Sequence, residues 1–351
     1  MVAKMTKQKQ IEILKSKIDQ FPKFQLGNYP TPLYKTKNFN KSLGIKNLYI
    51  KRDDLSGFAF GGDGVRGLEF RIGDILDKKC NIFIDNENAD SENSRFNAAA
   101  SIKAGIKYVI ITNKVLDNKN NKGNFFLRKL MNIDIHKLNN IDDNEISTYT
   151  NKLKNNYLKK GLKPYISKEE CFVQYSSIIG YISGAIELYY QLSNSESEKT
   201  KIFQIDGDSV LGMAIVNKFC KLNWEINSFS PDSMSNSNIK NLNSYINKNI
   251  SISKKLSEFL KLDLTLDKSD VNYDFDYSGH NYREPTQSSI NSLKLLAKTE
   301  SIFLDPIYTA KCMDGMIKYI NENKYSDENN LVFIHSGGLP NLFTYSNELI
   351  K

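Results

Sequence analysis

The sequence predicts an α/β fold built on parallel sheets, because short apolar runs typical of strands alternate with amphipathic segments typical of helices. The order strand, glycine-containing turn, helix occurs at Gly61-Gly62 and again at Gly207. The chain has 351 residues, of which 40% are hydrophobic and 25% are charged. This composition is that of a globular protein with material for one large domain or two linked domains.

The first half of the chain is expected to contain four strands in alternation with helices. Ile11, Leu14 and Ile18 have helical spacing, and Pro30 and Pro32 then mark an extended segment, because proline disfavours helix at the preceding residue. Strands are predicted at 48–50, 82–84, 108–111 and 133–135, and helices at 65–76, 94–104 and 125–130. The polar stretch 139–163 is expected to hold a helix between long loops.

The second half repeats this alternation. It is expected to contain a helix at 178–192, a strand at 202–205, the glycine-containing turn Asp206–Gly212 and a helix after that turn. The last third adds apolar segments at 293–296 and 309–320 and a strand at 331–334. The Asn/Ser/Lys-rich stretches 118–124 and 233–247 are expected to be surface excursions.

Charge, hydropathy and cysteine usage narrow the class of protein. The formal net charge of +8 comes from lysines spread along the chain and interleaved with acids, so no nucleic-acid partner is expected. No apolar run reaches the roughly 18 residues that span a bilayer, and Met1–Gln10 lacks the apolar centre of a secretion signal. We therefore expect a cytoplasmic protein without a membrane partner. The four cysteines show no CxxC spacing, which predicts reduced thiols and no metal site.

Several separated motifs match one enzyme family in the right order. They are Tyr29–Leu33, Lys51–Leu55, Phe60–Gly62, Gly123–Asn124, Pro285–Thr286, Leu304–Tyr308 and His335–Pro340. With these motifs the chain resembles the D-cysteine desulfhydrase and aminocyclopropane-carboxylate deaminase family, a branch of the tryptophan synthase β-subunit superfamily. The resemblance implies two three-layer α/β/α domains with pyridoxal phosphate and substrate in the cleft between them, and a homodimer. It implies a large domain of residues 1–64 and 176–351 and a small inserted domain of residues 65–175.

The residue that bonds the cofactor is the main departure from the family. The family reads Gly-Gly-Asn-Lys-x-Arg-Lys-Leu-Glu, whereas Gly61–Glu69 reads Gly-Gly-Asp-Gly-Val-Arg-Gly-Leu-Glu. The shared Arg66 and Leu68 fix the frame, so the Schiff-base lysine falls on Gly64. A glycine has no amine and can neither form the imine nor transfer protons. Lys51 could replace the lost amine only by leaving its own strand.

Two further segments depart from what the resemblance implies. The turn Asp206–Gly212 matches the phosphate-binding turn, with Gly207, Asp208 and Ser209 as its candidate cofactor-binding residues, but it carries two carboxylates. One carboxylate about 4 Å from a phosphate charge costs roughly 4 kcal/mol at an effective dielectric constant of about 20. The family's Gln-Ser-Asn-His motif, which faces the substrate carboxylate, is Asp90–Asn93 here, so an anionic substrate is expected to be repelled.

Some candidate site residues are retained. Tyr282 and Tyr308 resemble the tyrosines of the family's substrate pocket, although each could simply pack at the cleft. Ser91 matches an active-site serine, and a serine at this place is also a common helix N-cap. Ser336 stands where the family has a group near the cofactor ring. The run Lys51–Asp54 is interpreted as structural, with charges that satisfy one another, and His335 is expected to be a buried core residue.

These observations lead to one main hypothesis and two alternatives. The main hypothesis is a pseudoenzyme without a bound cofactor, which binds a small amino-acid-like molecule or an intact family member. The first alternative is an active pyridoxal-phosphate-dependent lyase or deaminase acting on a small amino acid, in which case the cofactor is retained. The second is a cofactor-free enzyme that reuses the cleft through Ser91, Glu92, Asp208 and Tyr308.

Overall fold

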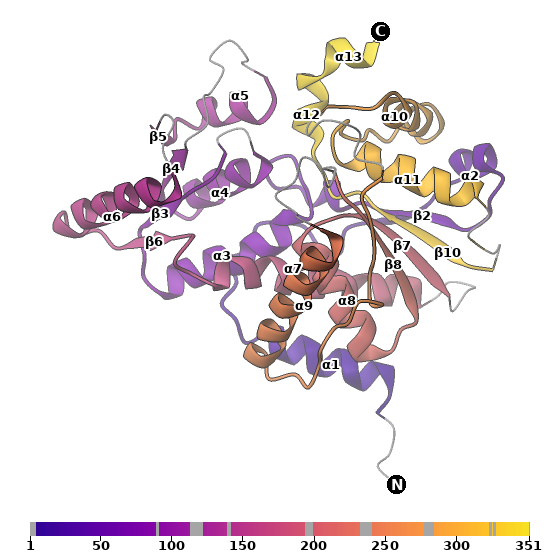
Figure 1. Cartoon of the computed structure of the whole chain (residues 1–351), viewed down its shortest axis with the longest axis horizontal. Coiled ribbons are helices and arrows are strands. Elements are labelled where there is room, and N and C mark those ends of the chain that lie inside the picture. Colours follow the sequence, from indigo (N-terminus) through magenta and orange to yellow (C-terminus); the bar gives the residue numbers. More distant parts are fainter. Residues whose placement is uncertain are drawn as a thin grey trace.

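The computed structural model describes residues 5–88, 91–112, 122–138, 142–193, 199–231, 241–276, 284–322, 325 and 328–350. Within these residues the strands form two sheets, in the orders β1-β2-β10-β7-β8-β9 and β5-β4-β3-β6 (Figure 1). The strands of the larger sheet are β1 (Leu33–Lys35), β2 (Leu48–Lys51), β7 (Thr200–Ile205), β8 (Trp224–Phe229), β9 (Asn272–Asp274) and β10 (Asn330–Ile334). Those of the smaller sheet are β3 (Ile82–Asp85), β4 (Lys107–Thr112), β5 (Asp134–Lys137) and β6 (Pro164–Ile166). The β1–β2 pair is antiparallel and the other pairs are parallel, which confirms the predicted α/β class.

Helices cover both faces of the larger sheet, because its strands are apolar on both sides. Ile202 and Val332 belong to the core on one face, and their neighbours Phe203 and Phe333 belong to the core on the other. The first face is covered by α1 (Lys7–Ile18), α7 (Phe172–Leu192), α8 (Asp208–Cys220) and α9 (Leu242–Phe259). The second is covered by α2 (Asn38–Leu43), α10 (Gln287–Glu300) and α11 (Thr309–Asn321), and by the short α12 (Leu339–Thr344) and α13 (Ser346–Ile350).

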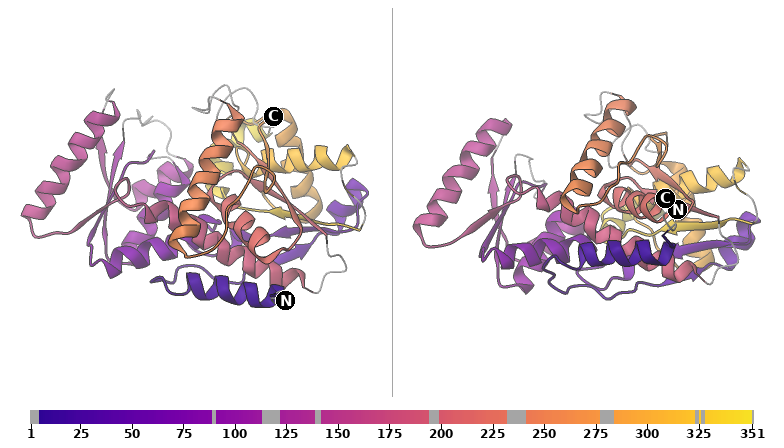
Figure 2. Two further views of the ribbon diagram at one scale, coloured as in Figure 1. Left: turned by 60° about the horizontal axis from the view of Figure 1, so that its bottom comes forward. Right: turned by 90° about the horizontal axis from the view of Figure 1, so that it is seen from below.

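The smaller sheet is also layered between helices. Phe83 and Ile110 pack against α3 (Gly64–Asp77) and α4 (Glu92–Lys103), while Ile84 and Val109 pack against α6 (Asp143–Lys159). The two views of Figure 2 show this sheet and its helices at one end of the molecule, with the larger sheet at the other. A short helix, α5 (Gly123–Leu130), contacts α12. The boundaries 64/65 and 175/176 between the implied domains remain a prediction.

Helices α3 and α7 join the two parts through a close contact between glycines. A Cβ on Gly67 would lie 2.6 Å from the Cα of Ser177, and one on Gly180 would lie 2.3 Å from the backbone nitrogen of Gly67. Both distances are shorter than any side chain tolerates, so the two backbones meet because neither residue has a side chain. Gly67 is therefore required by the packing of these two helices.

A buried network of charges reinforces the same junction. Arg66 donates to Asp53 on the short 3-10 helix η1 (Asp53–Leu55) and to Glu187 on α7, each at 2.8 Å. Lys51 donates to the same Glu187 and, at 2.7 Å, to the carbonyl of Thr31. The next two residues of the run, Arg52 and Asp54, also form an ion pair with each other at 2.7 Å. The structural interpretation of the run 51–54 is therefore confirmed.

Three expectations about the fold need correction. The stretch 233–247 is not a surface excursion throughout, because Asn241 caps α9, which begins at Leu242; residues 232–240 lie outside the described residues. The end of the stretch 118–124, also expected to be a surface excursion, is the first part of α5, which begins at Gly123. Strands β1, β6, β8 and β9 had not been expected.

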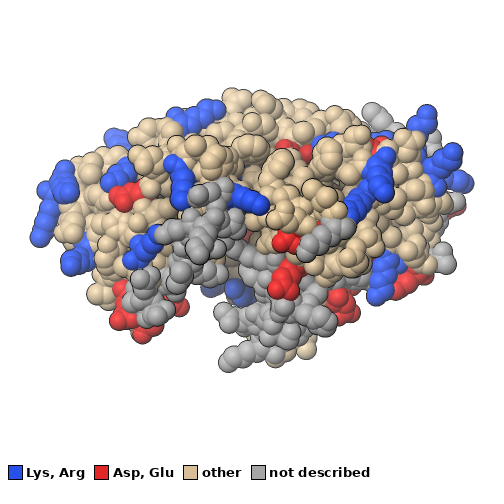
Figure 3. Space-filling model, turned by 90° about the horizontal axis from the view of Figure 1, so that it is seen from above, with Lys and Arg blue, Asp and Glu red and all other residues tan. Residues whose placement is uncertain are grey.

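The basic side chains are spread over the surface, as their spread along the sequence predicts. Figure 3 shows lysine and arginine side chains distributed over one face of the molecule. The four cysteines are unpaired. Among the described residues, no helix has the length and apolar character that crossing a membrane requires.

Candidate functional site

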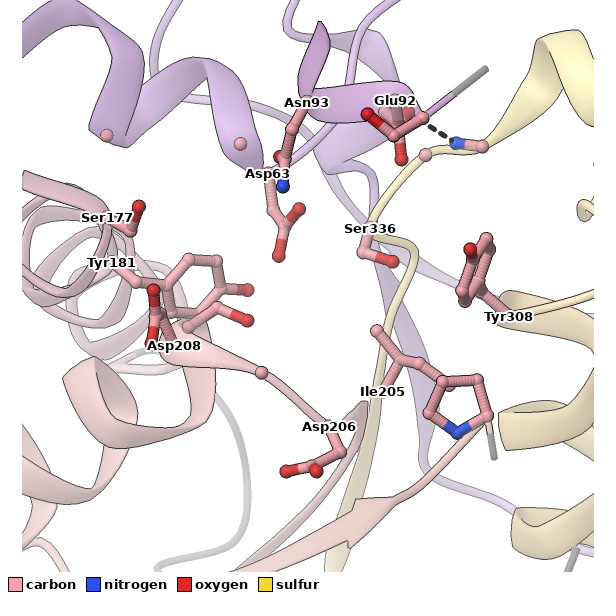
Figure 4. Close-up of a pocket in the computed structure, with 18 of the residues that line it drawn as sticks. Asp63, Glu92, Asn93, Ser177, Tyr181, Ile205, Asp206, Asp208, Tyr308 and Ser336 are labelled. Carbon is pink, nitrogen blue, oxygen red and sulfur yellow. Dashed lines mark hydrogen bonds between the residues drawn. The ribbon is translucent and has the colours of Figure 1, made fainter. Parts of the chain in front are cut away.

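A cavity of about 370 Å³ opens between the two sheets, at the carboxyl ends of the strands of the larger one. The start of α3, the start of α4, α7, the start of α8 and the turn after β10 all contribute to its wall (Figure 4). Segments that are about 270 residues apart, such as Gly64 and Ser336, thus line one cavity. The predicted residues Gly64, Ser91, Gly207, Asp208, Ser209, Tyr308 and Ser336 all line it. Tyr282 and Asp90 lie outside the described residues.

The ionisable groups of the cavity wall are dominated by acids. Six carboxyl side chains are among the lining residues: Asp63, Glu87, Glu92, Asp206, Asp208 and Asp305. No lysine or arginine is among the described residues that line the cavity. The partners of each carboxyl group therefore decide how much negative charge the cavity presents.

Asp63 is the acid at the start of α3, directly before Gly64. Its N–H donates to the carbonyl of Ser336 at 2.9 Å, which ties α3 to the turn after β10. Its side chain points into the cavity in Figure 4. Burial, followed by repulsion from Asp53 and Glu92, raises the pKa of Asp63 to about 7, and hydrogen bonding with the Ser209 hydroxyl lowers that pKa only in part.

The start of α8 carries two more acids with different surroundings. Asp206 accepts a hydrogen bond from Ser228 on β8 at 2.9 Å and another from Tyr245 on α9, and burial raises its pKa. Asp208 is the first residue of α8, and Gln174 reaches its carboxylate in a long contact of 3.4 Å. Burial also raises the pKa of Asp208. Of the two carboxylates expected to face a phosphate, Asp206 is therefore already bound by neighbouring strands and helices.

Ser91 and its neighbours form the wall at the start of α4. The Ser91 hydroxyl accepts from the N–H of Ser94 at 3.0 Å, which makes it the N-cap of α4, and it donates to Glu87 at 3.2 Å. Burial raises the pKa of Glu87 to about 6, with a further contribution from Asp85. The capping role confirms the simpler of the two interpretations of Ser91, although the residue also borders the cavity.

Glu92 does not present the free charge expected of it. Its carboxylate accepts from Arg95 at 2.7 Å and from the N–H of Gly338 at 3.1 Å, so it links α4 to the start of α12. The expectation that this acid repels an anionic substrate is therefore too strong, because an adjacent guanidinium offsets much of its charge.

Asp305 shapes the wall around Tyr308. It accepts from the N–H groups of Ile307, Tyr308 and Thr309 at 3.0, 3.0 and 2.7 Å and so holds the start of α11. Burial raises the pKa of Asp305 to about 6, against the effect of these bonds. A Cβ on Gly338, whose φ is +85°, would lie 2.7 Å from the Asp305 carboxyl carbon, so the glycine turn after β10 is required by packing.

Two residues of the matched motifs, Lys51 and His335, are not among the residues that line the cavity. Lys51 is 1% exposed and its ammonium group is held by Thr31, Glu187 and Gln191, so it does not replace an amine at Gly64. His335 is fully buried, and its Nε2 lies 2.9 Å from the carbonyl oxygen of Phe303. The expectation that His335 is a hydrogen-bonded core residue is confirmed.

The structure also adds residues to the site. Asp63, Glu87, Ser177, Tyr181 and Asp305 line the cavity and had not been singled out. Asp63 had a signal, because the motif that Gly61–Glu69 resembles has asparagine at this place. Ser177 and Tyr181 had none, since they lie on an apolar helix whose pattern indicates only burial.

Comparisons with known proteins agree with this architecture. The "Probable 1-aminocyclopropane-1-carboxylate deaminase" of Schizosaccharomyces pombe is 27% identical over 341 residues, which cover 94% of this chain and 98% of that protein. A protein of Pyrococcus abyssi named for the same deaminase activity is 27% identical over 345 residues, covering 95% of this chain and 97% of its own.

Solved structures show the same fold. One titled as an ACC deaminase homologue has a TM-score of 0.80 at 22% identity and covers 96% of this chain and 98% of its own. Threonine deaminase isoform 2 of Solanum lycopersicum has a TM-score of 0.63 at 16% identity, covering 98% and 88%. Residues 24–337 match the family described as "Pyridoxal-phosphate dependent enzyme". The chain therefore belongs to the pyridoxal-phosphate dependent enzyme family.

Proposed function

We propose that this protein is a pseudoenzyme of its family, which uses the inherited cleft for binding rather than for pyridoxal chemistry. The observation that carries the proposal is the composition of the cavity wall. The family motif assigns Gly64 to the place of the cofactor-bonding lysine, and no lysine is among the described lining residues. Without an amine, the imine exchange on which pyridoxal enzymes depend has no protein partner.

The wall also fits the cofactor poorly at its phosphate end. Phosphate sites at a helix start use bare N–H groups and positive charge, whereas the start of α8 has Asp208 in its first turn and Asp63 beside Ser209. Burial that raises the pKa of both carboxyls indicates surroundings that already disfavour negative charge. A phosphate dianion would add to that unfavourable charge.

The role that remains is binding of a small amino-acid-like molecule or of an intact relative. The cavity keeps a volume of about 370 Å³ and polar groups from Ser91, Tyr308 and Ser336, so side chains have not filled it. The family resemblance also leads us to expect a homodimer. Light scattering on the purified protein measures its oligomeric state.

Borohydride trapping tests the proposal directly. The purified protein is incubated with pyridoxal phosphate, reduced with borohydride, digested and examined by mass spectrometry. We expect scattered, low labelling of exposed lysines that does not saturate. Stoichiometric pyridoxyl modification of one lysine would refute the proposal. Gly64→Lys, treated in the same way, shows whether an amine at this position is reached.

The retained polar residues favour one alternative, an active deaminase or lyase on a small amino acid. Tyr308 and Ser336 line the cavity as the family resemblance implies for a working site. Release of ammonia from aminocyclopropane-carboxylate, or of sulfide from D-cysteine, above the rate in buffer with free pyridoxal phosphate would support it. A cofactor-free reaction at Ser91, Glu92, Asp208 and Tyr308 would instead be indicated by a metabolite that copurifies in native mass spectrometry and is consumed.

A further inference from the structure

We propose that Asp63 is a specificity-determining residue, whose carboxyl group excludes anionic ligands from the α8 end of the cleft and reserves this end for uncharged or cationic groups. The inference goes beyond the proposed function, since it concerns ionic recognition and needs no Schiff base. It rests on the place of Asp63 between the starts of two helices. The two helices are α3, which Asp63 directly precedes, and α8.

The geometry sets Asp63 where an anion would otherwise be favoured. The helix α8 has 13 residues, and the start of a helix of this length attracts negative charge. Asp63 at the start of α3 lines the same cavity as Ser209 in the first turn of α8, and the Ser209 hydroxyl contributes to the pKa of Asp63. Ser209 is held in turn by Gln204, whose Nε2 donates to it at 2.6 Å. In Figure 4 the side chain of Asp63 stands in the cavity between Ser336 and Tyr181.

The charged groups around Asp63 exclude anions but not cations. The groups that face Asp63 from the packed elements are Asp53 on η1, Glu92 on α4 and Tyr181 on α7, and Asp208 also lines the cavity on α8. Arg95 partly offsets Glu92, and Arg66, which faces Tyr181, is engaged by Asp53 and Glu187. Above about pH 7, where Asp63 is ionised, an anion that enters therefore meets a carboxylate, and no lysine or arginine is among the described residues that line the cavity.

The consequence is a preference set by charge. An ionised carboxylate about 4 Å from a phosphate charge lowers affinity on the order of a thousandfold at an effective dielectric constant of about 20. The affinity of an uncharged ligand is not lowered by this repulsion, and the affinity of an amine is raised. Asp63 differs from the family's asparagine by one oxygen in place of an amino group, so one substitution reverses the preference with little change of shape.

The test is binding of inorganic phosphate at pH 8, measured by isothermal titration on the full-length protein. The variants are Asp63→Asn and, as a matched control, Asp77→Asn, which removes the same charge from the exposed far end of α3. We expect Asp63→Asn to bind phosphate at least tenfold more tightly than the wild type, and Asp77→Asn to match the wild type.

Two results would overturn the inference. One is a folded Asp63→Asn that binds phosphate no more tightly than the wild type, and the other is an equal gain in affinity in both variants. If Asp63→Asn does not fold, Asp63→Ser replaces it under the same criteria. Borohydride labelling is independent of these measurements, so failure of this inference and failure of the proposed function are told apart.

Discussion

The Asp63 carboxyl group should make the stability of this protein fall as pH rises toward neutrality, and Asp63→Asn should remove that dependence. Burial and neighbouring acids raise the pKa of Asp63 from an ordinary value of 3.8 to about 7 in the folded chain. The folded protein therefore binds this proton more tightly than the unfolded chain does. The resulting stabilisation is complete below about pH 4 and is lost as pH rises through about 7.

The magnitude follows from the two pKa values. At ~1.4 kcal/mol per pH unit, the whole contribution is about 4 kcal/mol, and about 3 kcal/mol of it is lost between pH 5 and pH 8. Asparagine does not titrate, so Asp63→Asn should gain about 3 kcal/mol relative to the wild type over this interval. Glu87 and Asp305 titrate in the same range in both proteins, so their effects cancel in the difference.

Urea unfolding followed by circular dichroism at pH 5, 6, 7 and 8 measures the difference between the two proteins. The exposed Asp77→Asn serves as the control for loss of one charge from the same helix. A difference between Asp63→Asn and wild type that stays constant within 0.5 kcal/mol across this range would refute the reasoning. It would show that the carboxyl group remains well solvated when the protein is folded.

Two other sets of variants test the junction between the sheets by urea unfolding. Gly67→Ala should lower the free energy of unfolding by about 2 kcal/mol or more, because its Cβ would lie 2.6 Å from the backbone of Ser177. Gly64→Ala, in the same helix, should cost less than about 1 kcal/mol, since its Cβ meets only the Phe96 ring at 3.2 Å; equal losses would contradict the close-contact explanation. Glu187→Gln should cost about 3 kcal/mol, because two buried cations lose their shared carboxylate, and a loss below 0.5 kcal/mol would show that water reaches them.

The elements with a strong apolar pattern were predictable, because that pattern itself indicates which residues are buried. The strand predicted at 202–205 is β7 (Thr200–Ile205), the strand predicted at 331–334 is β10 (Asn330–Ile334), and the helix predicted at 178–192 lies within α7. All three are apolar on more than one side, as the centre of a layered sheet requires. The three-residue strands β1, β6 and β9 were not predictable, since pairing with a distant neighbour defines them and no local pattern does.

The position of the candidate site was also predictable, because motifs mark it. Gly64, the turn Asp206–Gly212 and Ser336 are far apart in the chain, and the family order alone places them together. The position of Asp63 in the same cavity wall as Ser209 was not predictable in this way. It depends on the separation of two helix starts, which is fixed by packing such as the glycine contact between α3 and α7.

The sequence alone overstated the free charge of Glu92 and Asp206, and it did not identify Asp63 as the most important acid. Glu92 is paired with Arg95, and Asp206 is held by Ser228 and Tyr245, so neither presents a free carboxylate. Asp63 has neighbours that mostly repel its charge, and it directly precedes Gly64, which has no side-chain amine. If Gly64 takes the place of the family's lysine, a covalent anchor is lost and a repelling carboxyl group is gained at adjacent residues of one helix start. Because the two changes act on different parts of the cofactor, restoring the lysine alone would leave the phosphate end unfavourable.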